Sequence, residues 1–236
     1  MSEKFEEYEK ALSRKSRKEI YAVEKKGDVK ASGAVRIVGG KYNVVKVSGA
    51  FRCDGDLEAN EVKISGSASI NGSLKASVIK VSGAMSVNGD IEGGQISISG
   101  ALKAHGTIRG GEVKVAGGIS SEEIIGGVLK IAGGIKAQRI VGKNVVIRVS
   151  DKVKTNEIVG DIIDIEGSEG FAINILNIIK ISRRRKAEVE VSDKIKAKLL
   201  KLRNVIIRGD VEADRIELYE NARILGNVKG EMVKMT

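Results

Sequence analysis

A repeat of 17 residues constrains this chain more than any other feature. The pattern Lys-Val-Ser-Gly begins at Lys46 and recurs with small changes from Lys63, Lys80, Ser97 and Lys114, and then one residue early from Lys130. A unit this short cannot bury a core of its own. Each copy is therefore predicted to be one turn of a stacked solenoid.

Alternation inside each repeat predicts short strands. An apolar–polar–apolar triplet opens all six copies, and two more alternating triplets follow in the first four; in one turn the three are residues 62–64, 68–70 and 74–76. A period of two places the aliphatic side chains inward and the lysines outward. A glycine follows the first triplet, and a dipeptide such as Asn71-Gly72 or His105-Gly106 follows the second; both are predicted to be corners with positive φ.

Asn-Gly between two strands is also typical of antiparallel hairpins. Like side chains that recur at one fixed interval favour parallel stacking instead. We therefore predict an all-β fold, a single-stranded parallel β-helix with a triangular cross-section and about 12 rungs of 16–17 residues. The absence of proline supports it, because proline cannot donate a ladder hydrogen bond.

The repeat divides the chain into four segments. Residues 1–26 are densely charged and are predicted to be a tail or a capping helix, and residues 27–160 a regular β-helix. The register weakens in 161–230, predicted to be an irregular continuation with bulges or longer loops. Triplets still return there at 163–165, 179–181 and 189–191, and residues 209–213 repeat the pattern of 55–59. Residues 231–236 are predicted to be a tail.

The composition limits where in the cell this protein can be located and which partners it can bind. The single Cys53 excludes an internal disulfide, and no apolar run reaches the length of a membrane span or resembles a secretion signal. We expect a cytoplasmic protein. The net charge of +10 could attract an anionic membrane surface or a nucleic acid, and does not decide between them.

The repeated segments resemble the bactofilins, polymer-forming cytoskeletal proteins of bacteria. The resemblance is carried by residues 46–49 with 55–59, 80–83 with 89–92, and 209–213; it is specific over about 30–145 and looser to about 230. It implies a right-handed β-helix that joins end to end into non-polar filaments without nucleotide. It also implies a scaffold that locates client proteins, often against the membrane.

Residues suited to catalysis are scarce. The only histidine, His105, occupies a corner slot that Asn71 and Asn88 fill elsewhere, and Cys53 occupies an inward slot that Ile70 fills. No phosphate loop, dinucleotide fingerprint or metal-ligand cluster is present. We predict that the chain is not an enzyme and needs no cofactor or metal.

Three surfaces are candidates for binding. Lys46, Lys63, Lys80, Lys114 and Lys130, with Lys30 before them, are predicted to form one outward ridge, either solvated or bound to an anionic surface. Arg183, Arg184, Arg185 and Lys186 form a cluster on a loop, either simply exposed or in contact with lipid or nucleic acid; without aromatic residues nearby, nucleic acid is the less favoured partner. A stacked coil also exposes unpaired backbone at its ends, and Leu225 and Val228 are predicted to mediate self-association.

Two functions follow from these surfaces. The first is a cytoskeletal scaffold that self-assembles through its ends. The alternative is a capped, monomeric β-helical module that binds lipid or nucleic acid.

Overall fold

The computed structural model describes residues 18–20, 27–167, 172–175, 179–182 and 187–235. Strands make up 86% of it, and the described residues contain no helix. The parallel strands form a β-solenoid of about 11 turns, which confirms the predicted fold class.

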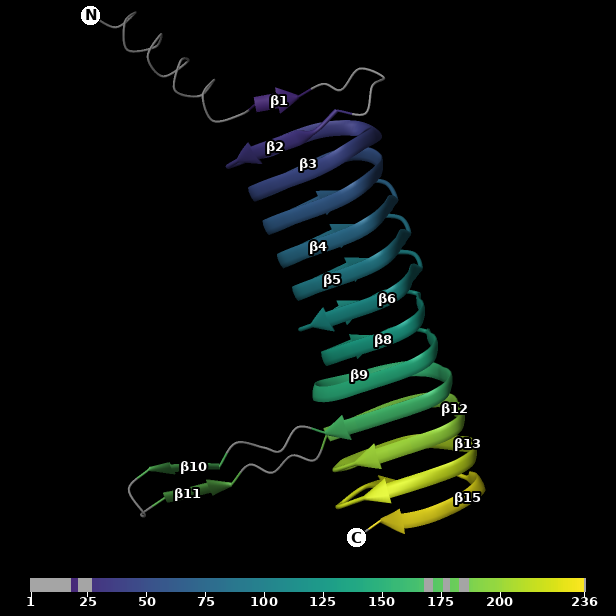
Figure 1. Cartoon of the computed structure of the whole chain (residues 1–236). Coiled ribbons are helices and arrows are strands. Elements are labelled where there is room, and N and C mark those ends of the chain that lie inside the picture. The colour runs from purple at the N-terminus through teal and green to yellow at the C-terminus, as the bar shows by residue number, and fades with distance from the viewer. Residues whose placement is uncertain (1–17, 21–26, 168–171, 176–178, 183–186, 236) are drawn as a thin grey trace, which may run out of the picture. The chain divides into compact units, whose positions relative to one another are not determined.

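The chain forms two compact units that divide between Gly110 and Gly111. In the first, β1 (Lys18–Ile20) and β2 (Val29–Ser32) pair in parallel with β3 (Val35–Ile70), a strand of 36 residues that continues through corners. β4 (Leu74–Val87) and β5 (Ile91–Ala104) follow as the next turns (Figure 1). Lys63 lies opposite Lys80 and Gly66 opposite Gly83, so the repeats stack like on like.

The second unit continues the same construction. Its strands are the last part of β6 (Ile108–Ala116), β7 (Ile119–Ser120), β8 (Glu123–Lys136), β9 (Arg139–Gly167), β12 (Ala187–Arg203), β13 (Val205–Tyr219), β14 (Arg223–Ile224) and β15 (Val228–Met235). The sheet order is β6-β8-β9-β12-β13-β14, with β7 on β8 and β15 on β13. β8 pairs in parallel with β7 and β9, β12 with β9 and β13, and β13 with β14 and β15.

An antiparallel hairpin interrupts the second unit. β10 (Ala172–Ile175) pairs with β11 (Ile179–Ser182) in a separate two-stranded sheet, with Ile173 opposite Ile181. The prediction that residues 179–181 form a solenoid triplet is therefore wrong. Alternation fits an antiparallel strand as well as a parallel one, and here a short connection lets neighbouring segments pair with each other. The parallel ladder resumes at β12, which pairs with β9.

Both ends of the chain contain more strand than the sequence indicates. Residues 18–20 form β1, in register with residues 35–37, rather than tail or helix. The rest of the segment 1–26 lies outside the described residues. Residues 231–235 belong to β15 rather than to a tail, because they pair with residues 215–219 of the preceding turn.

The core is a set of stacked aliphatic columns. Val62, Ile79 and Ile96 occupy the same position in successive turns and have no exposed surface, whereas Lys80 beside Ile79 points outward. Burying a side chain of this kind contributes about 1.5–3 kcal/mol. Because each side chain packs on its counterpart above and below, each turn depends on its neighbours.

The corner glycine after the first triplet is required by conformation and by space. Gly83 has φ of +123°, and a Cβ added there would collide with the carbonyl oxygen of Gly66 in the turn before. Gly49, Gly66 and Gly100 share the positive φ, which confirms the prediction for this corner.

The second corner is held by hydrogen bonds between a side chain of one turn and the backbone of the next. The Asp56 carboxylate accepts a hydrogen bond from the Ser73 amide at 2.7 Å, and the Asp90 carboxylate accepts one from the Thr107 amide at 2.7 Å. Between them, the Ser73 hydroxyl accepts one from the Asp90 amide at 3.2 Å. A side chain from each turn thus binds the backbone of the next.

This contact also explains the corner dipeptides. A Cβ on Gly106 would collide with the Asp90 carboxylate, so glycine gives the side chain of the preceding turn its space. The predicted positive φ is wrong at Asn71, at His105 and at the glycine after each, since none of these four has positive φ; it is confirmed at Gly55, after Asp54, where φ is +115°. At Gly72 and Gly106, close approach to the Asp56 and Asp90 carboxylates therefore requires glycine, rather than a left-handed backbone.

Replacing Gly83 tests the first corner. Gly83→Ala is expected to lower the free energy of unfolding by roughly 1–3 kcal/mol, because alanine meets both the positive φ and the Gly66 carbonyl. Gly118→Ala is the matched control, since Gly118 has an ordinary φ and no atom within 4 Å of the added Cβ. Urea unfolding measures both variants; equal stability would contradict the explanation.

The side-chain clamp at the second corner is tested at Asp90. Asp90→Ala removes the acceptor of the Thr107 amide and is expected to cost about 1–2 kcal/mol of unfolding free energy. Asp90→Asn keeps an acceptor oxygen and should remain closer to the parent protein. Thermal and urea unfolding compare the two; an alanine variant as stable as the asparagine variant would exclude a role for this bond.

Candidate functional site

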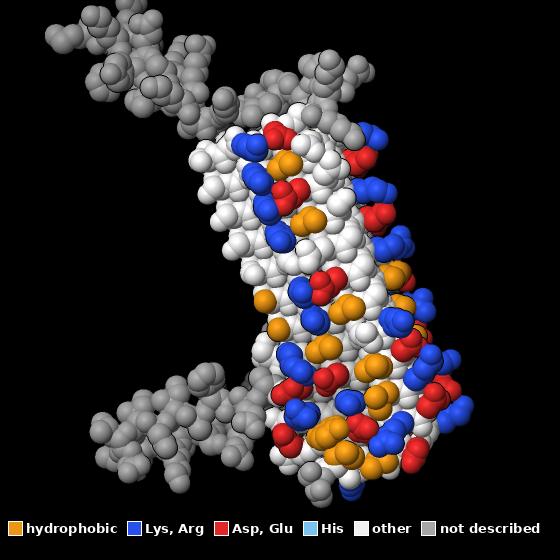
Figure 2. Space-filling view, viewed as in Figure 1, with side chains coloured by type: hydrophobic (Ala, Val, Ile, Leu, Met, Phe, Trp, Pro, Cys, Tyr) orange, Lys and Arg blue, Asp and Glu red, His pale blue; other side chains and the backbone are white. Residues whose placement is uncertain are grey.

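The last turn exposes apolar side chains that earlier turns bury. Val228 lies opposite Val211 and Met232 opposite Ile216, yet the exposed fractions are 38% against 2% and 50% against 0%. Leu225 is 57% exposed. Of the four large hydrophobic side chains exposed in the described part of the chain, only Ile162 lies outside this turn. Figure 2 shows hydrophobic side chains at the surface of the last turns.

The backbone of the last turn has a free edge. β14 and β15 both pair with β13, and no other described strand pairs with either of them. Their outer N–H and C=O groups are therefore available to another strand. The predicted candidates Leu225 and Val228 lie on this edge, and the structure adds Met232.

Polar contacts hold the last turn on the turn before it. The Asp210 carboxylate accepts a hydrogen bond from the Asn227 amide at 2.8 Å, which lowers the pKa of Asp210. Lys229 donates to the Glu212 carboxylate at 3.0 Å and lowers the pKa of Glu212. These contacts hold the free edge in place on the turn before it.

A buried carboxylate supports the turn beneath. Glu217 is 8% exposed; it accepts hydrogen bonds from the Tyr219 hydroxyl at 2.9 Å and from Arg215 Nε at 3.0 Å, and Lys201 Nζ lies 3.4 Å away. The Tyr219 hydrogen bond and the nearby cations lower the pKa of Glu217. Sequence reasoning missed this cluster, because Glu217 stands at an outward position of the alternating pattern.

The first turns do not show the same exposure. Val29 and Val35, near the start of the described solenoid, are 2% and 4% exposed. β1 covers the edge of β3 at Val35. Apolar exposure at an end is thus a property of the last turn among the described residues.

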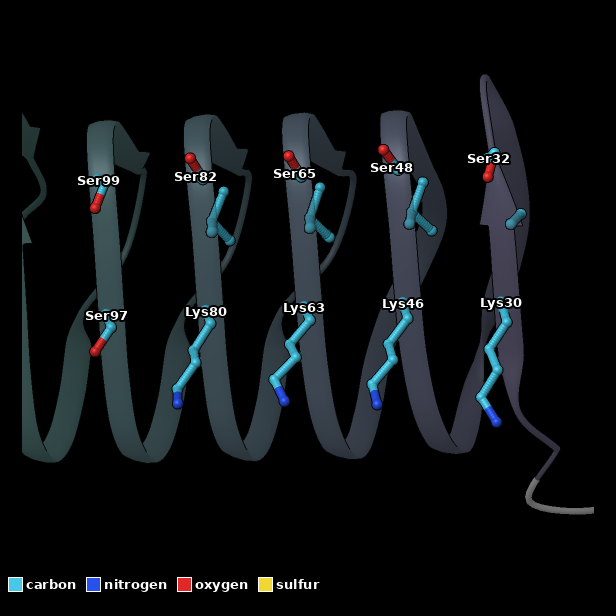
Figure 3. A pocket seen from close by; sticks show the side chains of 14 residues that line it. Lys30, Ser32, Lys46, Ser48, Lys63, Ser65, Lys80, Ser82, Ser97 and Ser99 are labelled. Atoms are coloured by element: carbon cyan, nitrogen blue, oxygen red, sulfur yellow. The ribbon is translucent and has the colours of Figure 1, made fainter.

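The predicted lysine ridge is present in part. In the first unit, Lys30, Lys46, Lys63 and Lys80 extend from successive turns on the same side, and Ser97 takes the next position (Figure 3). Lys114 and Lys130 lie in the second unit, on β6 and β8, where Lys130 is opposite Val146. The cluster Arg183, Arg184, Arg185 and Lys186 lies outside the described residues.

A second row runs beside these lysines. Ser32, Ser48, Ser65 and Ser82 extend from the same strands, two residues further along (Figure 3). The two rows line an open groove of about 860 Å³, here called the Lys–Ser groove. Its floor is made by Ala31, Val47, Ile64 and Val81.

A polar pocket in the second unit was not anticipated. It has a volume of about 350 Å³ and is lined in part by Ser121, Lys136, Gln138, Lys154 and Glu190. The Ser121 hydroxyl is buried in it without a hydrogen-bond partner in the described structure. The repeat pattern could not reveal the pocket, because the interval between turns changes here: Ser120 pairs with Lys136, 16 residues on, and Lys136 with Lys154, 18 residues on.

The two residues weighed for chemistry lie at structural positions. Cys53 is fully buried as predicted, and its thiol contacts the Gly55 carbonyl at 3.5 Å. Burial, with Asp54 and Asp56 nearby, raises the pKa of Cys53 to about 12, so the thiol stays protonated at neutral pH. His105 lies at a corner, where its amide donates to the Val87 carbonyl.

The described residues contain no group of three or more metal-binding side chains and no helix that could cross a membrane.

Comparisons with models of protein families, with curated proteins and with solved structures found no match to this chain. The bactofilin resemblance therefore remains a prediction.

The Asp210–Asn227 contact gives the last turn a pH dependence. Because folding lowers the pKa of Asp210, the contact is complete above the unfolded value of about 3.9 and is lost as pH falls through the lower folded pKa. An NMR titration of the Asn227 amide should show a midpoint below about 3.9, and Asp210→Asn should remove it. A midpoint at or above 3.9 would contradict the contact.

Proposed function

We propose that this protein is structural, and that copies join end to end through the last turn, here called the C-terminal edge (residues 223–235). The observation that carries the proposal is the exposure of Val228 and Met232 at positions that are buried one turn earlier. An identical chain offers the same pairing groups and the same apolar surface, so the last turn of a second copy can pair with this edge and bury these side chains.

The sequence of the C-terminal edge is suited to pairing with itself. When two copies meet antiparallel about Gly230, Val228 of one faces Met232 of the other, and Lys229 faces Glu231. Apolar residues then face apolar residues, and opposite charges face each other. Such a two-fold contact joins like ends and closes after two copies.

A filament needs a contact at the other end as well. The bactofilin resemblance supports one, and with it the paired copies extend into a non-polar filament. Stacking supplies the energy of assembly through backbone bonds and apolar burial, so no nucleotide is required. A protein of this kind acts as a scaffold for client proteins.

Placing a charge on the C-terminal edge tests the proposal. Leu225→Glu is expected to weaken self-association at least about tenfold, because a carboxylate would be buried without a partner. Analytical ultracentrifugation over a wide range of concentration measures it, without nucleotide. Negative-stain electron microscopy then shows whether the assemblies are pairs or filaments.

Ile162→Glu is the matched control. Ile162 is also an exposed aliphatic residue of the second unit, 44% accessible, but it lies on β9. The control should associate like the parent protein. A parent protein that stays monomeric at every concentration, or equal weakening by both variants, would exclude the C-terminal edge.

A further inference from the structure

We propose that the Lys–Ser groove of the first unit binds a linear polyanion with closely spaced phosphate groups. This goes beyond the proposed function, because it uses a side of the turns rather than their end. The groove is open, and its two rows of hydrogen-bond donors run across at least four turns.

The donors along the groove are spaced closely enough to bind successive phosphates of one chain. Adjacent strands lie about 4.8 Å apart, so each row repeats a donor at that interval and the four lysines span about 14 Å. A chain laid along the groove meets an ammonium group on one side and a hydroxyl on the other at every turn (Figure 3). Phosphate oxygens accept from both groups, so phosphates in a row can be bound repeatedly.

The lysines of the groove carry more positive charge than the nearby carboxylates neutralise. Lys30 pairs with Asp28 at 2.8 Å, and Lys46 and Lys63 share Glu61 at 3.7 and 2.5 Å. Within the described residues Lys80 makes no ion pair. Four lysines against two carboxylates leave a net charge of +2 along the groove. Like charges repeated in a column repel one another, and a polyanion removes that repulsion.

The serine row has hydroxyl groups that are not bound to other protein groups in the described part of the chain. The hydroxyls of Ser48, Ser65 and Ser82 are exposed and have no hydrogen-bond partner among the described residues. They stand two residues from the lysines on the same strands. The second row of donors is therefore free to bind the same chain.

The lining residues separate a phosphate chain from other anionic partners. None of them is aromatic, so nucleobases would have no side chain on which to stack. The described part of the first unit exposes no large hydrophobic side chain, so a membrane would gain no apolar contact there. A linear phosphate polymer requires neither.

Binding of inorganic polyphosphate to the full chain tests the proposal, with anisotropy or calorimetry as readout at several salt concentrations. Lys46→Gln/Lys63→Gln/Lys80→Gln is expected to weaken binding at least about tenfold and to reduce the slope of log K against log salt by about 2. Ser97→Lys, which lengthens the row, should tighten binding and steepen that slope by about 0.7.

Matched variants separate the groove from net charge. Lys41→Gln/Lys75→Gln/Lys103→Gln removes three exposed charges of the first unit outside the groove and should bind like the parent protein. Ser86→Lys, on the neighbouring outward column, is the control for Ser97→Lys. Equal losses in the two triple variants would overturn the proposal. Tighter binding to single-stranded DNA or to anionic lipid vesicles than to polyphosphate would also overturn it.

Discussion

Hydrogen bonding between turns that stack in register is the constraint on which the rest of this structure depends. A single turn orders about 17 residues and buries only a few aliphatic side chains, so it is not expected to fold alone. Register brings Lys63 opposite Lys80 and Val62 opposite Ile79, and thereby places every polar column outside and every aliphatic column inside. The proposed binding surfaces follow from that repetition.

The corners fix this register. Gly83 must accommodate both a positive φ and the carbonyl of the turn before it, while Asp56, Ser73 and Asp90 each bind backbone of the next turn. A shift by one residue would break both contacts and turn the apolar columns outward. The last turn has the same partners below it and none above among the described residues. Its exposed Leu225 and Val228 are therefore a consequence of the stacking.

Repetition also explains which features the sequence could predict. The 17-residue interval predicts parallel stacking, the inward columns and the buried Cys53, because these depend on side chains that recur. It did not predict the hairpin of β10 and β11, since residues 179–181 alternate as a solenoid triplet does. Nor did it predict the basis of the second corner, because the Gly106 contact with Asp90 joins residues of different turns. The Glu217 cluster and the Ser121 pocket likewise depend on local contacts that do not repeat.

Site-resolved hydrogen exchange tests most directly whether each turn depends on its neighbour. In dilute solution, amides of β15 should exchange much faster than those of β13, which has strands on both sides. At concentrations where copies associate, the β15 amides should become protected while those of β4 remain unchanged. Protection of β15 equal to that of β13 in dilute solution, and unaffected by concentration, would contradict the central claim that the last described turn lacks a partner on its outer side.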